Sequence, residues 1–133
     1  MSCKSVLYTA MTVPVSVAAG GVVPLGAIVR RFGNAIRVDG NAITLLEPGY
    51  YAISVNMTVD PLAASAVTAR VEENGVPVAG ATVTATPAAI GDDTPLQIPS
   101  AVVRVYCNGT KTITVNLPVA ATVNNAAVTV VKV

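Results

Sequence analysis

Hydrophobic and polar side chains alternate with a period of two along much of the chain, most clearly from Tyr51 to Asp60. There the odd positions are Tyr, Ile, Val, Met and Val, and the residues between them are Ala, Ser, Asn, Thr and Asp. Successive side chains of a β-strand point to opposite faces, so this pattern predicts a half-buried strand. The side chains on its hydrophobic side are Tyr51, Ile53, Val55, Met57 and Val59.

A second alternating segment, from Val67 to Glu72, leads into the dipeptide Asn74-Gly75. This dipeptide favours a type I′ turn because both central residues adopt positive φ, so it predicts a β-hairpin. Further runs rich in β-branched residues and bounded by Gly, Pro and Asp predict shorter strands. These strands are expected near Val6–Thr12, Val23–Arg30, Ala35–Val38, Ala42–Leu46, Val76–Thr86 and Ala127–Val133.

The dipeptide Asn108-Gly109 predicts a second hairpin, which would join Ala101–Cys107 to Lys111–Leu117. The alternation before this turn places Cys107 on the inward side of its strand. Together these segments give nine or ten short strands and no convincing helix, which indicates a β-sandwich or jelly roll. Because no repeat or linker divides the chain, we expect residues 1–133 to form a single domain.

The composition extends this picture from fold to assembly. Hydrophobic residues make up 53% of the chain and charged residues only 11%, whereas an ordinary soluble domain carries about 25% charged residues. A surface so poor in charge aggregates unless another subunit covers it, so we expect an obligate assembly. The net charge of +1 argues against nucleic-acid binding, and the absence of histidine excludes catalytic and metal sites that depend on it.

A family resemblance rests on the segment AIRVDGNAITLLEPGYYAISVNMTV, in which Pro48, Gly49 and Tyr51 form the turn into the long core strand. This segment resembles the central signature of the family that unites tumour necrosis factor with the globular domain of the first complement component. The chain from Val23 to Val133 is similar to bacterial members that cap collagen-like spore-surface proteins, and related domains occur in phage structural proteins. The resemblance implies a ten-stranded jelly-roll sandwich that forms a homotrimer. Unlike the spore and complement members, this chain contains no Gly-x-y collagen stalk.

The resemblance also suggests which residues lie in the core or at the trimer interface. One of the two adjacent tyrosines should fill the core, and the other should approach the trimer axis. The candidates for these positions are Tyr50, Tyr51, Ile53, Val55, Met57 and Tyr106.

Several charged or reactive residues have two interpretations each. Asp92-Asp93 could contribute to a calcium site, as in some relatives, or form a solvated turn, which we favour because calcium needs six to eight oxygens. Arg30-Arg31 could contact a phosphate or carboxylate of a partner, or end a strand with one arginine paired to an acidic neighbour. Cys3 and Cys107 could be bridged, but two free thiols are the expectation.

The sequence contains no nucleophile elbow, phosphate loop or dinucleotide fingerprint. We therefore predict no catalytic residue, no metal site and no cofactor, and we expect a protein that is not an enzyme. The uncharged stretch from Ser5 to Val29 is long enough to span a membrane, but its prolines and glycines argue against a helix. We interpret residues 1–21 as the first strand and a candidate anchoring segment.

These observations favour a trimeric surface or decoration component of a phage virion or phage-like particle, made in the host cytoplasm. Its expected partners are further copies of itself and capsid or tail proteins, which it would contact through the N-terminal segment. The alternative is a receptor-binding or adhesive trimeric module on a bacterial or spore surface. The segments Asp60–Ala66 and Pro87–Ser100, interpreted as loops, lack aromatic and arginine residues, which favours the structural role.

Overall fold

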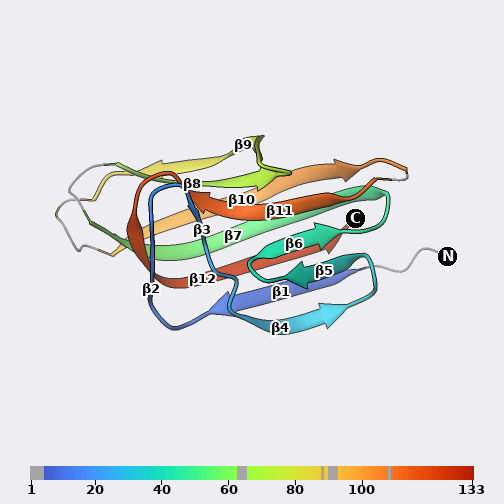
Figure 1. Ribbon diagram of the computed structural model, residues 1–133, viewed down its shortest axis with the longest axis horizontal. Coiled ribbons are helices and arrows are strands. Elements are labelled where there is room, and N and C mark those ends of the chain that lie inside the picture. Colours follow the sequence, from blue (N-terminus) through green and yellow to red (C-terminus); the bar gives the residue numbers. More distant parts are fainter. Residues whose placement is uncertain (1–4, 63–65, 88, 90–92, 108) are drawn as a thin grey trace.

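The computed structural model describes residues 5–62, 66–87, 89, 93–107 and 109–133, and its regular elements are all β-strands. Twelve strands form two six-stranded sheets, and the second sheet lies over the first in the view of Figure 1. The first sheet consists of β10 (Thr94–Val105), β7 (Gly49–Pro61), β12 (Ala121–Lys132), β1 (Val6–Met11) and β4 (Ala27–Phe32), with β2 (Val15–Val17) beside β12. The second consists of β5 (Ile36–Asp39), β6 (Ala42–Leu45), β11 (Lys111–Leu117), β8 (Val67–Glu73) and β9 (Val76–Ala85), with β3 (Gly21–Val22) beside β11.

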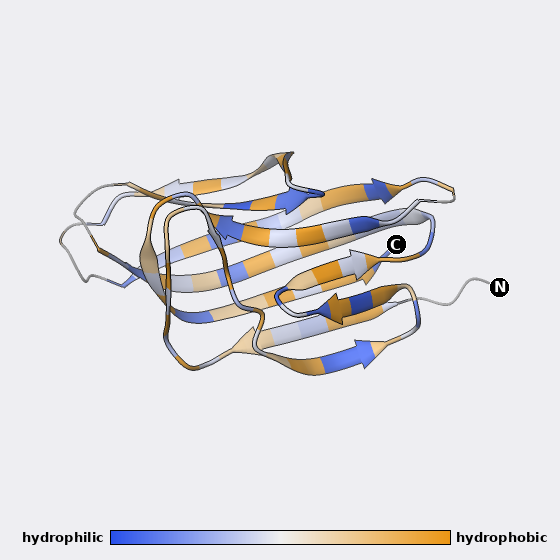
Figure 2. Ribbon diagram, in the orientation of Figure 1, coloured by the Kyte–Doolittle hydropathy of each residue, from blue (hydrophilic) through white to orange (hydrophobic). Residues whose placement is uncertain are grey.

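The core lies between the two sheets and is built by the alternation along each strand. In Figure 2 the ribbons of the long strands change repeatedly between hydrophobic and hydrophilic colours, as this arrangement requires. The inward side chains of β7 are at most 3% exposed, and they are Tyr51, Ile53, Val55, Met57 and Val59. They pack with buried side chains of the second sheet, among them Ile43, Leu45, Val71, Ile113 and Val115.

Tyr51 combines full burial with a satisfied hydroxyl group. Its ring is 0% exposed, and its Oη donates a hydrogen bond of 2.7 Å to the main-chain carbonyl of Glu47. Burial raises the pKa of this phenol above its ordinary value of 10.0. The tyrosine therefore links the turn before β7 to the core.

The structure confirms the hairpin at Asn74-Gly75. These two residues have φ angles of 50° and 82°, and β8 and β9 pair as antiparallel neighbours on either side of them. Asparagine tolerates the left-handed region better than most residues, and glycine has no Cβ to oppose it.

The predicted hairpin at Asn108-Gly109 is wrong. β10 belongs to the first sheet and β11 to the second, so residues 106–110 carry the chain between sheets instead of reversing it within one. β10 ends at Val105, and Cys107 is exposed in the connection, so the prediction that it faces the core is also wrong. Asn108 itself lies outside the described residues.

The N-terminal third has two short strands that the sequence analysis did not predict. The strand expected near Val23–Arg30 begins only at Ala27, as β4, directly after Gly26, and the short strand β3 lies before the expected segment. Gly26 has φ +75°, and a Cβ there would collide with the main-chain carbonyl oxygen of Ala10. This close approach of β4 to β1 requires glycine and interrupts the strand, and with β2 and β3 the count is twelve strands instead of ten.

Two β-bulges explain the other boundary differences. β10 begins at Thr94, so much of the segment interpreted as the loop Pro87–Ser100 is strand, and its alternation shifts between Ile98 and Ala101. β12 begins at Ala121 instead of Ala127, and its alternation shifts between Val123 and Asn125. A bulge inserts one unpaired residue and so changes the face on which later side chains lie.

The two ends of the described chain lie at the same end of the sandwich (Figure 1). The main-chain N–H of Lys132 donates to the carbonyl of Ser5 at 2.9 Å, and that of Val133 donates to the carbonyl of Tyr50 at the same distance. In the described part of the chain, no helix is long and apolar enough to cross a membrane.

Candidate functional site

The outer face of the first sheet is the side of β10, β7, β12, β1 and β4 that points away from the second sheet. The strand register fixes which residues adjoin one another on it. One row runs Phe32, Val6, Val131, Ala52 and Val102, each paired with the next across neighbouring strands. A parallel row contains Ala27, Ala10, Ala127 and Asn56. Both rows consist of uncharged and mostly small or apolar residues.

Charge is confined to the margins of this outer face. Arg30 lies on β4 at one edge of the sheet, and Arg104 lies on β10 at the other. Asp60 lies near the far end of β7, where a hydrogen bond from the side chain of Asn124 holds the pKa of its carboxyl below the usual range. The centre of the outer face therefore presents no charge to solvent.

Large apolar side chains near the edges remain exposed. Phe32 at the end of β4 is 66% exposed, and Val102 on β10 is 60% exposed. Val29 is also exposed on β4, where a bulge interrupts the pairing with β1, whereas the exposed Ile28 pairs with the buried Thr9 and therefore lies on the core side of this edge. A contiguous, uncovered surface of this kind marks an interaction site more often than a free surface.

At the end of the outer face near the chain termini, three side chains form what we call the tyrosine–arginine cluster: Tyr50, Arg104 and Tyr106. Arg104 is paired with Tyr50 in the register of β10 and β7. Its guanidinium carbon lies 5.6 Å from the centre of the Tyr50 ring and 4.4 Å from that of Tyr106, which are cation–π distances. The Nζ of Lys111 lies 6.0 Å from the Tyr106 ring and 3.1 Å from the carboxylate of Glu73.

The six residues singled out from the sequence divide into two groups. Tyr51, Ile53, Val55 and Met57 are buried in the core, whereas Tyr50 and Tyr106 are exposed. The structure brings the rings of these two exposed tyrosines to the guanidinium of Arg104, which the sequence analysis did not single out. The signal for Arg104 was present, because it lies between the inward residues Val103 and Val105 and must therefore point outward.

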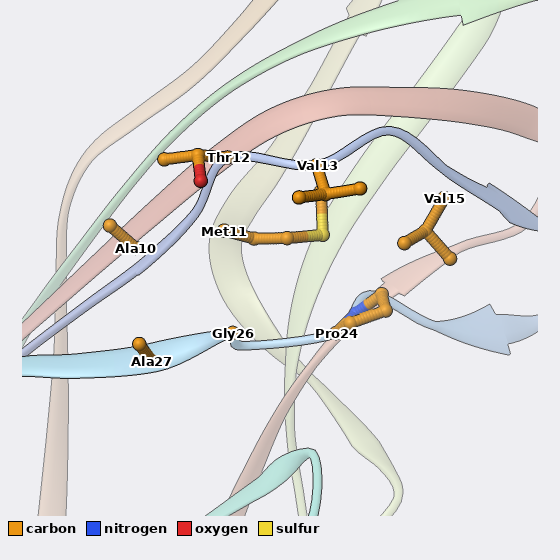
Figure 3. A pocket seen from close by; sticks show the side chains of 8 residues that line it. All are labelled: Ala10, Met11, Thr12, Val13, Val15, Pro24, Gly26 and Ala27. Atoms are coloured by element: carbon orange, nitrogen blue, oxygen red, sulfur yellow. The ribbon is translucent and has the colours of Figure 1, made fainter.

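A groove of about 350 Å³ adjoins the outer face where β1 turns into β2 (Figure 3). Met11, Val13 and Val15 line one side, and Pro24 and Ala27 line the other, with Gly26 at the point of closest approach. Thr12 supplies the single side-chain hydroxyl. This lining offers apolar contact and no group suited to acid–base or nucleophilic chemistry.

Among the described residues, neither Arg30 nor Arg31 has the acidic partner that the ordinary interpretation of this pair expected. Arg30 Nη1 donates to the carbonyl of Val29 at 2.9 Å, and Arg31 Nη2 donates to that of Ile36 at 3.4 Å. Within the described part of the chain, the ion pairs are Arg37–Asp39, Arg70–Glu72, Lys111–Glu73 and Lys132–Glu47.

The remaining candidates for chemistry do not gather into a site. Across the described ranges, no group of three or more Cys, Asp or Glu side chains is placed to hold a metal ion. Asp93 accepts a hydrogen bond from Asn124 Nδ2 at 3.2 Å, while Asp92 lies outside the described residues. Cys107 has a free thiol, and Cys3, its proposed partner, also lies outside them.

Comparison with known proteins finds no matching family model and no matching curated protein, but it does find similar solved structures. Mouse APRIL superposes with a TM-score of 0.75 at 16% identity, covering 98% of this chain and 100% of that one. The globular domain of zebrafish complement 1qA gives 0.69 at 10% identity, with 95% and 94% covered. The vertex protein P5 of PRD1 gives 0.63 at 17% identity, with 97% and 96% covered. The chain therefore has the tumour-necrosis-factor-like jelly-roll fold that these three proteins share.

Proposed function

We propose that this protein is a non-enzymatic structural module, a homotrimer that forms a surface or decoration component of a phage virion or phage-like particle. The observation that carries the proposal is the outer face of the first sheet, which is extended, uncharged at its centre and uncovered. A sheet face of this composition is stable in water only when another surface covers it.

A second copy of the chain is the occupant that fits this outer face. An apolar contact of several hundred Å² with each neighbour, at about 25 cal/mol per Å², contributes on the order of 10 kcal/mol before association costs. The small side chains of Ala52 and Ala127 allow close approach of a neighbouring protomer, and the charged residues lie where the rim of such an interface would be. The trimer is the symmetry that the family resemblance implied.

The particle role is supported by the fold and by the position of the chain ends. A phage vertex protein has the same fold as this chain over nearly its whole length. The first strand, β1, lies between β12 and β4, so the start of β1 has a fixed position in the sheet. A segment that starts there can contact a capsid or tail protein while the jelly roll projects outward.

Light scattering of the purified protein tests the assembly. We expect a compact trimer that persists on dilution to nanomolar concentration, and we expect Ala52→Glu and Ala127→Glu to give folded monomers because each places a charge within the contact. Ala79→Glu, on the exposed part of β9 in the second sheet, is the matched control and should remain a trimer. A wild-type mass near 13.4 kDa, or trimers of both outer-face variants, would contradict the proposal.

A further inference from the structure

The tyrosine–arginine cluster has the features of a recognition site for an anion. Tyrosine and arginine are the side chains most enriched among residues that dominate binding energy at protein interfaces. Here Tyr50 is 50% exposed and Tyr106 is 60% exposed, so both rings are accessible. Their contacts with Arg104 hold the guanidinium in place without consuming its N–H donors, because a cation–π contact uses the face of the ring.

Among the described residues Arg104 forms no ion pair, as is also true of Arg30 and Arg31, but of these three arginines only Arg104 lies at cation–π distance from two tyrosine rings. Arg37, Arg70, Lys111 and Lys132 each pair with a carboxylate at 2.8 to 3.1 Å. No carboxylate in the part of the chain that the structure describes forms an ion pair with Arg104. Guanidinium N–H groups match the two oxygens of a carboxylate in a bidentate geometry, so Arg104 is suited to donate to an acidic group of another molecule.

The strand that carries Arg104 indicates that this other molecule is a peptide. β10 lies at the edge of the first sheet and, among the described strands, it pairs only with β7. Pro95 and Pro99 blunt the first half of this edge because proline has no N–H to donate. The second half, Ala101 to Val105, contains no proline and leads directly into the cluster. An extended segment that adds to this half by main-chain hydrogen bonds lies beyond the sheet edge and places alternate side chains on the side of the sheet that carries Arg104.

We propose that the second half of β10 and the tyrosine–arginine cluster form a docking site for an extended, acidic peptide segment of another protein. The peptide adds as a strand beside Ala101 to Val105, and one of its carboxylates accepts the N–H donors of Arg104 between Tyr50 and Tyr106. The site lies at the end of the sandwich where the chain termini are found (Figure 1). Under the proposed function Arg104 stands at the rim of the trimer contact, so the docking site is compatible with the trimer and is tested separately from it.

The test uses the full chain and two synthetic peptides of β-forming sequence, Thr-Val-Glu-Val-Glu-Val-Thr and its matched version with Gln at both Glu positions. Titrations followed by amide NMR shifts should show saturable binding of the Glu peptide, with shifts confined to residues 49–52 and 101–106. The Gln peptide should bind about tenfold or more weakly, because a hydrogen-bonded charge pair is lost.

Three variants locate the site on the chain. Arg104→Gln should weaken binding of the Glu peptide about tenfold or more and bring it close to that of the Gln peptide. Tyr106→Leu should weaken it by a smaller factor, since it removes one face that orients the guanidinium. Arg30→Gln, which removes the same charge at the opposite edge of the same sheet, is the control and should leave binding unchanged.

Four results would overturn the proposal: no binding of either peptide, equal binding of both, full binding by Arg104→Gln, or saturable binding of an acidic polysaccharide in place of the peptide. Light scattering on the same samples separates this test from that of the trimer. A monomeric wild type that binds the Glu peptide retains the docking site and rejects the trimer. A trimer that binds neither peptide retains the trimer and rejects the docking site.

Discussion

At the scale of single residues, Tyr50 and Tyr51 show how strand geometry separates adjacent identical side chains. Tyr51 lies in the core, and its hydroxyl is satisfied by the carbonyl of Glu47. Tyr50 points to the opposite side and contacts Arg104. The period-two pattern predicts that the two residues differ, and the continuation Ile53, Val55 indicates which of them is buried.

Removing the hydroxyl of Tyr51 tests its role. Tyr51→Phe should cost about 1 kcal/mol of stability at pH 7, since it leaves the Glu47 carbonyl without its partner. Because folding raises the pKa of Tyr51 above 10.0, its favourable contribution is complete below pH 10 and is lost as the pH rises through the higher folded-state value. The deficit of the variant should therefore shrink above pH 10.

Chemical denaturation of wild type and variant, at equal protein concentration and at several pH values, measures this difference. Other groups that titrate in this range are common to both proteins and cancel in the comparison. A deficit that stays constant from pH 7 to pH 11 would mean that the hydroxyl is not held neutral by burial.

At the scale of the strands, the close approach of the chain at the start of β4 to β1 depends on one position without a side chain. Gly26→Ala should be strongly destabilising, by about 3 kcal/mol or more, because the new Cβ meets main-chain atoms of Ala10 and Met11 and the residue keeps φ +75°. Gly40→Ala is the matched control, with φ +61° and no heavy atom within 4 Å of the added Cβ. It should cost only about 1 kcal/mol, from backbone strain alone.

Thermal or denaturant unfolding of the two glycine variants measures the contrast. Comparable losses for both would show that the approach of β4 to β1 can relax. A loss confined to Gly26→Ala would establish that this main-chain contact limits how the edge of the first sheet is built.

The strands also show which features of the fold local sequence patterns can predict. The long core strand and the Asn74-Gly75 hairpin were predictable because their signals are local, a period of two and a turn dipeptide. Asn108-Gly109 is an equally strong turn signal, but it does not specify the sheet to which the next strand belongs. The bulges after Ile98 and Val123 change the phase of the alternation. The alternation of hydrophobic and polar residues is therefore interrupted at each bulge, and a strand predicted from it ends there.

The candidate site was predictable only in part, for the same reason. Tyr50 and Tyr106 could be named from their residue types, but nothing in the local pattern shows that β7 and β10 are neighbours. That pairing joins positions about 50 residues apart and brings Arg104 close to both rings. The cluster is a product of sheet topology.

At the scale of the whole molecule, the scarcity of charge and the position of the two ends of the described chain are consistent with one orientation of the module on a particle surface. The uncharged centre of the outer face suits burial against further copies, while residue 5 and the C-terminal strand lie together at one end of the sandwich. A module held at that end projects its opposite loops outward. Under the proposed function, the first residues of the chain then lie next to the surface that holds the trimer.

Deleting Met1 to Lys4 tests this orientation. The truncated protein should fold and form a trimer, because β1 begins at Val6 and its pairing with β12 and β4 is left intact. Its incorporation into particles should fall, which mass spectrometry of purified particles can quantify against the full-length chain. Normal incorporation of the truncated trimer would place the attachment elsewhere on the module. Particles that never contain the full-length protein would reject the virion role and favour a trimeric adhesive module at a bacterial or spore surface.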